Sequence, residues 1–167
     1  WATMTVSTSN VEICNLALTK IGEEPITALT EDSKAGRLCN LHFNRTRNMT
    51  LRAHNWNFAI KRSDLAKSTT TPEFKFTAQF ALPDDLIRLL DTNLVNDQDY
   101  KVEGKFILCS SDTLKIKYVA EMLDPSYFDE LFIEALSCKL AAELAIPLAD
   151  NVSLAEFMYQ QYAAKLR

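Results

Sequence analysis

Apolar residues at helical spacing predict a first helix near the start of the chain. It is expected to begin at Ser9, because Ser9 and Glu12 have the spacing of a capping box, in which each side chain accepts from the other residue's backbone amide. Gly22 stands where a left-handed C-terminal cap is expected, so the helix should end just before it. The apolar positions of this helix are Ile13, Leu16, Ala17 and Ile21.

A second helix of roughly six turns is expected to begin near Thr30, with Glu31 and Asp32 at the positive end of its dipole. Its predicted inner stripe is Ala35, Leu38, His42, Thr46, Met49 and Ala53, with Cys39 and Phe43 beside it. The basic residues spread over the rest of its surface are Arg37, Arg45, Arg47 and Arg52.

From Trp56 the apolar spacing changes to two, which predicts strands. Alternation runs over residues 56–60, and it is clearest over residues 74–80, where a half-buried strand is expected. The segment Leu82-Pro83-Asp84-Asp85 should break that strand, because proline cannot donate to a β ladder. A short apolar strand is expected to resume over residues 86–90.

Turn residues predict two closing hairpins. Glu103-Gly104 separates residues 100–102 from 105–109, and glycine permits the positive φ that a tight turn needs. Residues 110–112 then lead into a strand over 114–120. The sheet is therefore expected to be mostly antiparallel, with one face in solvent.

A third helix is expected from residue 125 or 126 to Ile146, where Pro147 should stop it. It is apolar on two sides, so it should either be central in a bundle or be covered by another subunit. The second of these sides consists of Ile133, Leu136, Leu140 and Leu144. A fourth helix is expected to begin at Ser153, with Glu156 as its capping-box acid.

The predicted elements define an α+β fold, a four-helix bundle with a mostly antiparallel β lobe inserted between the second and third helices. The bundle should comprise residues 4–55 and 121–167, and the lobe residues 56–120, in a single compact chain. Trp1 to Thr3 are interpreted as residues added ahead of a native start at Met4.

Composition and charge narrow the function classes. The net charge of −4 gives no general attraction for nucleic acid. No apolar run approaches the ~20 residues of a membrane span, and the N-terminus has no secretory signal pattern. The four cysteines are scattered without a Cys-x-x-Cys pair, which predicts free thiols in a reducing compartment.

Residues with catalytic or metal-binding chemistry form no convincing constellation. Cys39 and His42 could face one metal, but zinc needs three or four ligands, and the only other histidine is His54. The acidic pairs are sequence neighbours, which suits solvated loops and first helical turns better than the facing pair of a glycosidase. These pairs are Glu23-Glu24, Asp84-Asp85 and Asp129-Glu130. We therefore assign no catalytic residue, no metal and no cofactor.

The arginines of the second helix could contact phosphates, but no aromatic residues are interleaved with them. A solvated face or ion pairing between subunits is favoured over DNA contact.

Several segments occur in a characteristic order along residues 11–166. They are Asn15-Leu16-Ala17-Leu18 with Ile21-Gly22-Glu23-Glu24-Pro25-Ile26, Trp56-Asn57-Phe58-Ala59, Phe80 to Leu89 around Leu82-Pro83-Asp84, Tyr100 to Gly104, Ile116 to Val119, and Phe128 to Ala141. In this order and spacing they resemble the head-to-tail adaptor proteins of short-tailed phages, also called tail tubular protein A.

The resemblance implies a structural protein without enzymatic activity. Such an adaptor forms a dodecameric ring between the portal protein and the tail nozzle protein, and genomic DNA passes through its channel without specific recognition. It would reside in the virion tail, and in the host cytoplasm during assembly, and an isolated subunit could be a monomer. The candidate inter-subunit or partner contacts are Arg37, Arg45, Arg47, Arg52, Ile133, Leu136, Leu140 and Leu144, and the structural junction is Trp56, Phe58, Leu82 and Pro83.

Two alternatives stay open. One is a peptidoglycan hydrolase that uses the carboxylates of Glu130 and Glu134 or of Asp84 and Asp85. The other is a DNA-binding module that uses the arginines of the second helix. The aromatic pair Trp56 and Phe58 is expected to pack where the β lobe joins the bundle and to fix the angle between the two.

Overall fold

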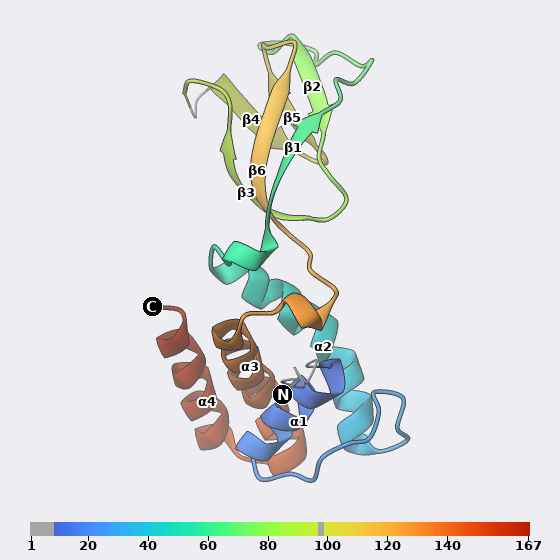
Figure 1. Ribbon diagram of the computed structural model, residues 1–167, viewed down its shortest axis with the longest axis vertical. Coiled ribbons are helices and arrows are strands. Elements are labelled where there is room, and N and C mark those ends of the chain that lie inside the picture. The colour runs from blue at the N-terminus through green and yellow to red at the C-terminus, as the bar shows by residue number, and fades with distance from the viewer. Residues whose placement is uncertain (1–8, 97–98) are drawn as a thin grey trace, which may run out of the picture. The chain divides into compact units, whose positions relative to one another are not determined.

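The computed structural model describes residues 9–96 and 99–167, which divide into two compact units (Figure 1). Among the described residues, the helical unit contains residues 9–58 together with Met122–Arg167, and the β unit lies within Ala59–Glu121. Four α-helices and two small antiparallel sheets occur within the described residues, and the sheets lie between the second and third helices in the sequence. The α+β prediction is therefore confirmed. The interpretation of Trp1 to Thr3 as added residues lies outside the described part of the chain.

Helix α1 (Asn10–Lys20) has the predicted caps. The Ser9 hydroxyl accepts from the Glu12 amide at 3.2 Å, and the Ser9 amide donates to the Glu12 carboxylate at 3.4 Å. Gly22 follows the helix with a φ of +75°, where a side chain would be strained. The Asn15 amide group then fixes the returning loop, since it donates to the Ile26 carbonyl at 3.0 Å and accepts from the Ile26 amide at 2.8 Å.

Helix α2 (Lys34–Ala53) begins four residues later than Thr30, so the predicted start was wrong. The Glu31 carboxylate instead holds a turn, because it accepts from the Thr27 amide and from the Ser33 hydroxyl. Ser33 is the N-cap and accepts from the Gly36 amide at 3.0 Å. A Cβ at Gly36 would lie 2.6 Å from the Glu31 carbonyl oxygen, so this close approach requires glycine.

The buried face of α2 is rotated from the predicted stripe. Met49 and Ala53 are exposed, whereas Cys39, Phe43 and Thr50 are buried. The prediction placed Cys39 and Phe43 only beside the stripe, although burial centres on them.

Helix α3 (Glu130–Ala149) follows a short 3-10 helix, η3 (Pro125–Tyr127), and Asp129 caps it by accepting from the Leu131 amide at 3.0 Å. Pro147 lies inside the helix, so the prediction that it stops the helix was wrong. Proline removes one hydrogen bond in this last turn, near an exposed surface where water can replace it. Asp150, in the left-handed conformation with φ 47°, ends the helix instead.

Helix α4 (Val152–Lys165) begins directly after that turn. Asn151 caps it by accepting from the Leu154 amide at 2.9 Å, so the predicted start at Ser153 was wrong. Met158 and Tyr162 are buried, while Phe157 is half exposed. Helix α3 packs against α1, α2 and α4, which makes it the central helix of this unit.

The β unit contains six strands, which form two three-stranded antiparallel sheets with the orders β1-β6-β3 and β2-β5-β4. The strands are β1 (Ile60–Leu65), β2 (Ala78–Ala81), β3 (Leu86–Thr92), β4 (Tyr100–Glu103), β5 (Phe106–Cys109) and β6 (Leu114–Ala120). Both sheets contribute to one core, which includes Phe80, Ile107, Leu114, Ile116 and Tyr118.

Two of the predicted strands begin later than expected. Residues 57–59 form a 3-10 helix, η1 (Asn57–Ala59), so alternation from Trp56 did not indicate a strand there. Residues 74–77 are also outside β2, because Lys75 has a φ of +68°, which interrupts extended backbone. Phe74 is consequently 72% exposed rather than part of the core.

Of the two predicted hairpins, one is confirmed. Strands β4 and β5 pair through a turn at Gly104, whose φ is +60°. Strand β6 does not pair with β5, however, and instead joins β1 and β3. The second hairpin was therefore wrong, because burying Leu114 and Ile116 against Phe80 and Ile107 places β6 in the opposite sheet.

Candidate functional site

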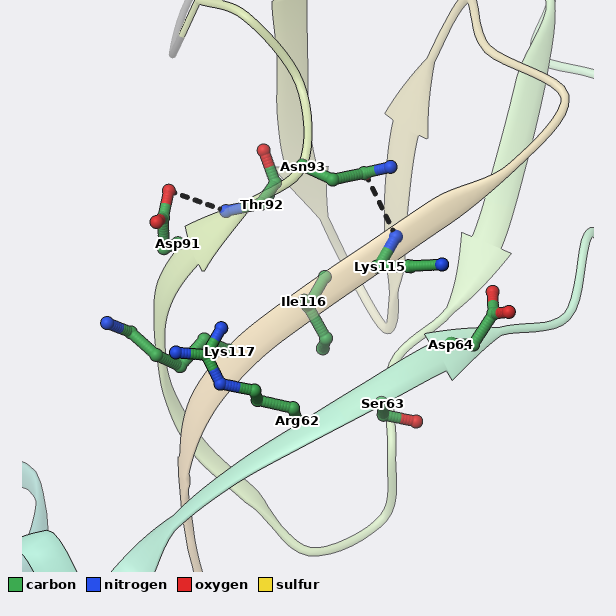
Figure 2. Close-up of a pocket in the computed structure, with 9 residues that line it drawn as sticks. All are labelled: Arg62, Ser63, Asp64, Asp91, Thr92, Asn93, Lys115, Ile116 and Lys117. Carbon is green, nitrogen blue, oxygen red and sulfur yellow. Dashed lines mark hydrogen bonds between the residues drawn. The ribbon is translucent and has the colours of Figure 1, made fainter.

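The outer surface of the β1-β6-β3 sheet carries a shallow pocket of about 430 Å³ (Figure 2). Strand register places side chains of opposite sign together, since Asp64 is opposite Lys115 and Asp91 is opposite Lys117. Arg62 is also opposite Lys117, so these two side chains project from the same face of the sheet (Figure 2). The complete lining is Arg62, Ser63, Asp64, Asp91, Thr92, Asn93, Lys115, Ile116 and Lys117.

Backbone contacts hold one side of this pocket. The Asn93 side-chain oxygen accepts from the Lys115 amide at 3.0 Å, and the Asn93 amide donates to the Lys115 carbonyl at 3.0 Å. The Asp91 carboxylate accepts from the Thr92 amide at 2.8 Å. With cations and carboxylates on three strands, the pocket suits a ligand that carries both signs of charge. Sequence reasoning missed the pocket because it depends on the pairing of distant strands.

A second group of polar side chains in the β unit surrounds Asp85, which is partly exposed. Its carboxylate accepts from the Tyr118 hydroxyl at 3.0 Å and from the Lys61 ammonium at 2.9 Å. Burial alone would raise the pKa of Asp85, but these two bonds outweigh burial and lower that pKa below its ordinary value. Burial and the neighbouring carboxylate raise the pKa of Tyr118 to about 12. Asp85 therefore holds two strands together.

The carboxylates proposed for a hydrolase make structural contacts or lie at exposed positions. Glu134 accepts from the Lys20 ammonium at 2.7 Å, which links α3 to α1. Glu130 is exposed in the first turn of α3, where the helix dipole stabilises negative charge. Asp84 is exposed beside Asp85 in the β unit. Within neither unit are two of these carboxylates seen to face each other as a glycosidase pair would.

The arginines of α2 separate into two groups. Arg37, Arg45 and Arg52 are exposed, and Arg37 pairs with Asp32 at 2.6 Å. Arg47 is only 4% exposed, so its prediction as a partner contact was wrong. It donates to the side-chain oxygens of Asn44 and Asn48 at 3.1 Å each.

The apolar side of α3 that was predicted to meet a partner is buried within the chain. Ile133 is nearly buried, and Leu136, Leu140 and Leu144 are completely buried. Their prediction as inter-subunit contacts was wrong, because α3 packs against α1, α2 and α4, which leaves this side almost no exposed surface. They contribute to the core of the helical unit.

The four predicted junction residues fall in different units. Trp56 and Phe58 pack on Phe132 of α3, with ring centroids 5.1 and 5.0 Å away. Leu82 and Pro83 belong to the turn between β2 and β3, where the Leu82 amide donates to the Lys105 carbonyl at 2.9 Å. The expected effect of the aromatic pair on the angle between the units stays a prediction.

The four cysteines are free and buried. Cys14 donates to Cys39 in a thiol hydrogen bond, and this bond together with burial raises the pKa of Cys14 above its ordinary value. Cys39 is buried, whereas His42 is half-buried. Across residues 9–96 and 99–167, no cluster of three metal-ligating side chains occurs. The described helices also include none that is long and apolar enough to cross a membrane.

Comparison with known proteins gives no family assignment. No family model matches the chain, and no curated protein matches it.

Proposed function

We propose that this chain is a structural adaptor of a short-tailed phage, which joins the portal protein to the tail nozzle protein and extends the DNA channel. It would act as a dodecameric ring in the virion tail after assembly in the host cytoplasm. Genomic DNA would pass through the ring without specific recognition. The proposal rests on the ordered sequence resemblance and on what the matching residues do in the fold.

The observation that carries the proposal is that the matching segments supply structural ties. Asn15 clamps the loop at Ile26 through two hydrogen bonds. Trp56 donates to the Thr50 carbonyl at 2.9 Å at the end of α2. Asp85, directly before β3, accepts from the Tyr118 hydroxyl of β6. A chain that shares these segments in order is expected to share the same two-unit fold, which supports a common assembly role.

Reconstitution with the portal protein of the same phage tests the proposal. The purified chain is examined alone and with portal by native mass spectrometry and electron microscopy. We expect the chain to form a ring bound to portal, because portal would act as the template on which monomeric chains assemble. A chain that neither binds portal nor forms a ring under these conditions would refute the adaptor role.

A second candidate function, DNA binding, is favoured by the exposed arginines of α2. If these residues bind phosphates, DNA affinity should fall steeply as salt is raised. Replacing Arg45 with Gln should reduce the slope of that dependence. Weak affinity with a flat salt response in the parent protein would eliminate this candidate.

A further inference from the structure

A groove between α3 and α4 exposes apolar side chains in the helical unit. Its volume is about 400 Å³. Ile146, Val152 and Tyr159 line it, and each is at least half exposed. The charged lining residues are Glu143 and Glu156, both exposed acids, and no base lines the groove among the described residues. A complementary partner would therefore be a basic surface with apolar side chains at its centre.

The outer face of α2 has that composition. Leu41 is 69% exposed on the side of α2 opposite its buried residues Cys39 and Phe43. Positions three, four and seven apart on a helix share one side, so basic residues surround Leu41. The exposed members of this basic face are Lys34, Arg37, Leu41, Arg45, Met49 and Arg52.

We infer that the basic face of α2 in one copy docks into the α3–α4 groove of a neighbouring copy. Arg45 and its basic neighbours would face Glu143 and Glu156, while Leu41 would cover apolar surface in the groove. The contact joins two different surfaces of the same unit, so it is heterologous and repeats from copy to copy. This inference deepens the proposed adaptor role and rests on it, because such a contact can close into a ring.

A second copy fits these surfaces better than DNA does. A groove with two acids and no base would repel phosphate, so DNA binding would leave its apolar residues exposed. Leu41 would likewise be an apolar group at the centre of a phosphate-binding face. Docking of one surface on the other covers both apolar regions and opposes unlike charges.

Site-directed crosslinking tests the contact directly. Chains with Leu41→Cys are mixed with chains that carry Val152→Cys, and a short bismaleimide joins accessible thiols. The native cysteines are buried and should react slowly. We expect the mixed dimer to form about ten-fold faster than either homodimer, because only the mixture places the two cysteines across a contact. A control mixture carries Thr19→Cys, an exposed position on α1, in place of Leu41→Cys.

A charge exchange then separates docking from random collision. Adding Arg45→Glu to the first chain, or Glu156→Arg to the second, should each slow crosslinking about ten-fold, since an attraction becomes a repulsion. Combining the two changes should restore the rate. Raising salt from about 0.1 M to about 1 M should also slow crosslinking, because the screening length falls from roughly 10 to 3 Å.

Each outcome is decisive for the contact. The contact would be overturned if crosslinking were no faster than in the Thr19→Cys control. It would also be overturned if the charge changes altered only DNA affinity. Portal-bound rings without the specific crosslink would overturn the inference and leave the adaptor role standing. A specific crosslink without rings or portal binding would support the contact and refute the adaptor role.

Discussion

Replacing Trp56 should weaken the helical unit more than any change at an exposed aromatic residue. The indole is buried, and its N–H donates to the Thr50 carbonyl at 2.9 Å. Thr50 lies in the last turn of α2, where carbonyls lack partners within the helix. The ring also packs edge-on against Phe132 at 5.1 Å and against His54 at 4.7 Å. Trp56 therefore caps α2 and attaches its end to α3.

Two substitutions separate these contributions. Trp56→Ala removes the ring and the hydrogen bond, and should lower the free energy of unfolding by about 3–5 kcal/mol, the range for large aromatic deletions in a core. Trp56→Phe keeps most of the apolar contact but leaves the carbonyl of Thr50 without its donor. The expected loss is about 1–3 kcal/mol, the cost of an unsatisfied buried polar group. The order of stability should be parent, then Trp56→Phe, then Trp56→Ala.

Urea denaturation followed by circular dichroism at 222 nm measures these losses, because the signal comes mainly from the helices. Because the chain contains two compact units, the urea titration should also be followed by a signal from the β unit, such as the amide NMR signals of its strands. Phe157→Ala is the matched control. Phe157 is a half-exposed aromatic on α4 of the same unit, and its loss should change stability by only about 0.5 kcal/mol.

The result that would refute this reasoning is specific. If Trp56→Ala denatured at the same urea concentration as Phe157→Ala, the ring would not be part of the core. If Trp56→Phe matched the parent while Trp56→Ala did not, the packing would hold and the capping role of the indole N–H would be wrong.

Three further predictions concern other parts of the chain. The folded-state pKa of Tyr118 is raised to about 12, so its contribution to stability should be complete below its unfolded pKa of about 10. That contribution should be lost between roughly pH 10 and 12. Alkaline denaturation of Tyr118→Phe should lack this loss. Because the pKa of Asp85 is lowered, its contribution to stability should be present above its unfolded pKa of about 4 and be lost as the pH falls below that value. Acid titration of Asp85→Asn should therefore show a smaller loss of stability than that of the parent protein. In the partly exposed Lys20–Glu134 pair, Glu134→Gln should cost no more than about 1 kcal/mol by urea denaturation and leave any peptidoglycan turnover unchanged.

The elements that were predictable from sequence are those whose determinants lie close together along the chain. The Ser9–Glu12 capping box, the cap at Gly22 and the turn at Gly104 all formed as expected. In each case a few neighbouring residues satisfy the backbone or permit a positive φ. No distant part of the chain was needed to identify them.

Sequence was less reliable where two neighbouring residues could each cap a helix. Thr30 and Ser33 are both suitable caps for α2, and Ser33 does so because the Glu31 carboxylate holds the preceding turn. Asn151 rather than Ser153 caps α4, because the left-handed residue Asp150 lets the next helix begin at once. The choice in both cases depends on how the chain enters the helix.

Strand pairing and the pocket were not predictable by local reasoning. The assignment of β6 to the sheet of β1 and β3 depends on the core that both sheets share. Lys115 and Lys117 alternate with Ile116 in sequence, which indicated a solvent-facing side of a strand. Nothing local indicated that Arg62 and Asp91 would flank Lys117 from two other strands.

Arg47 shows how burial affects the choice of residues for a functional test. Arg47 lies four residues after Phe43 and so shares its buried side of α2, with its guanidinium 6.0 Å from the centre of the Phe43 ring. Reversing its charge would place a carboxylate beside that ring, which should destabilise α2. A loss of assembly in Arg47→Glu would then arise from unfolding and would say nothing about a partner. Arg45, exposed on the opposite side of the helix, is the position at which a charge change tests the surface alone.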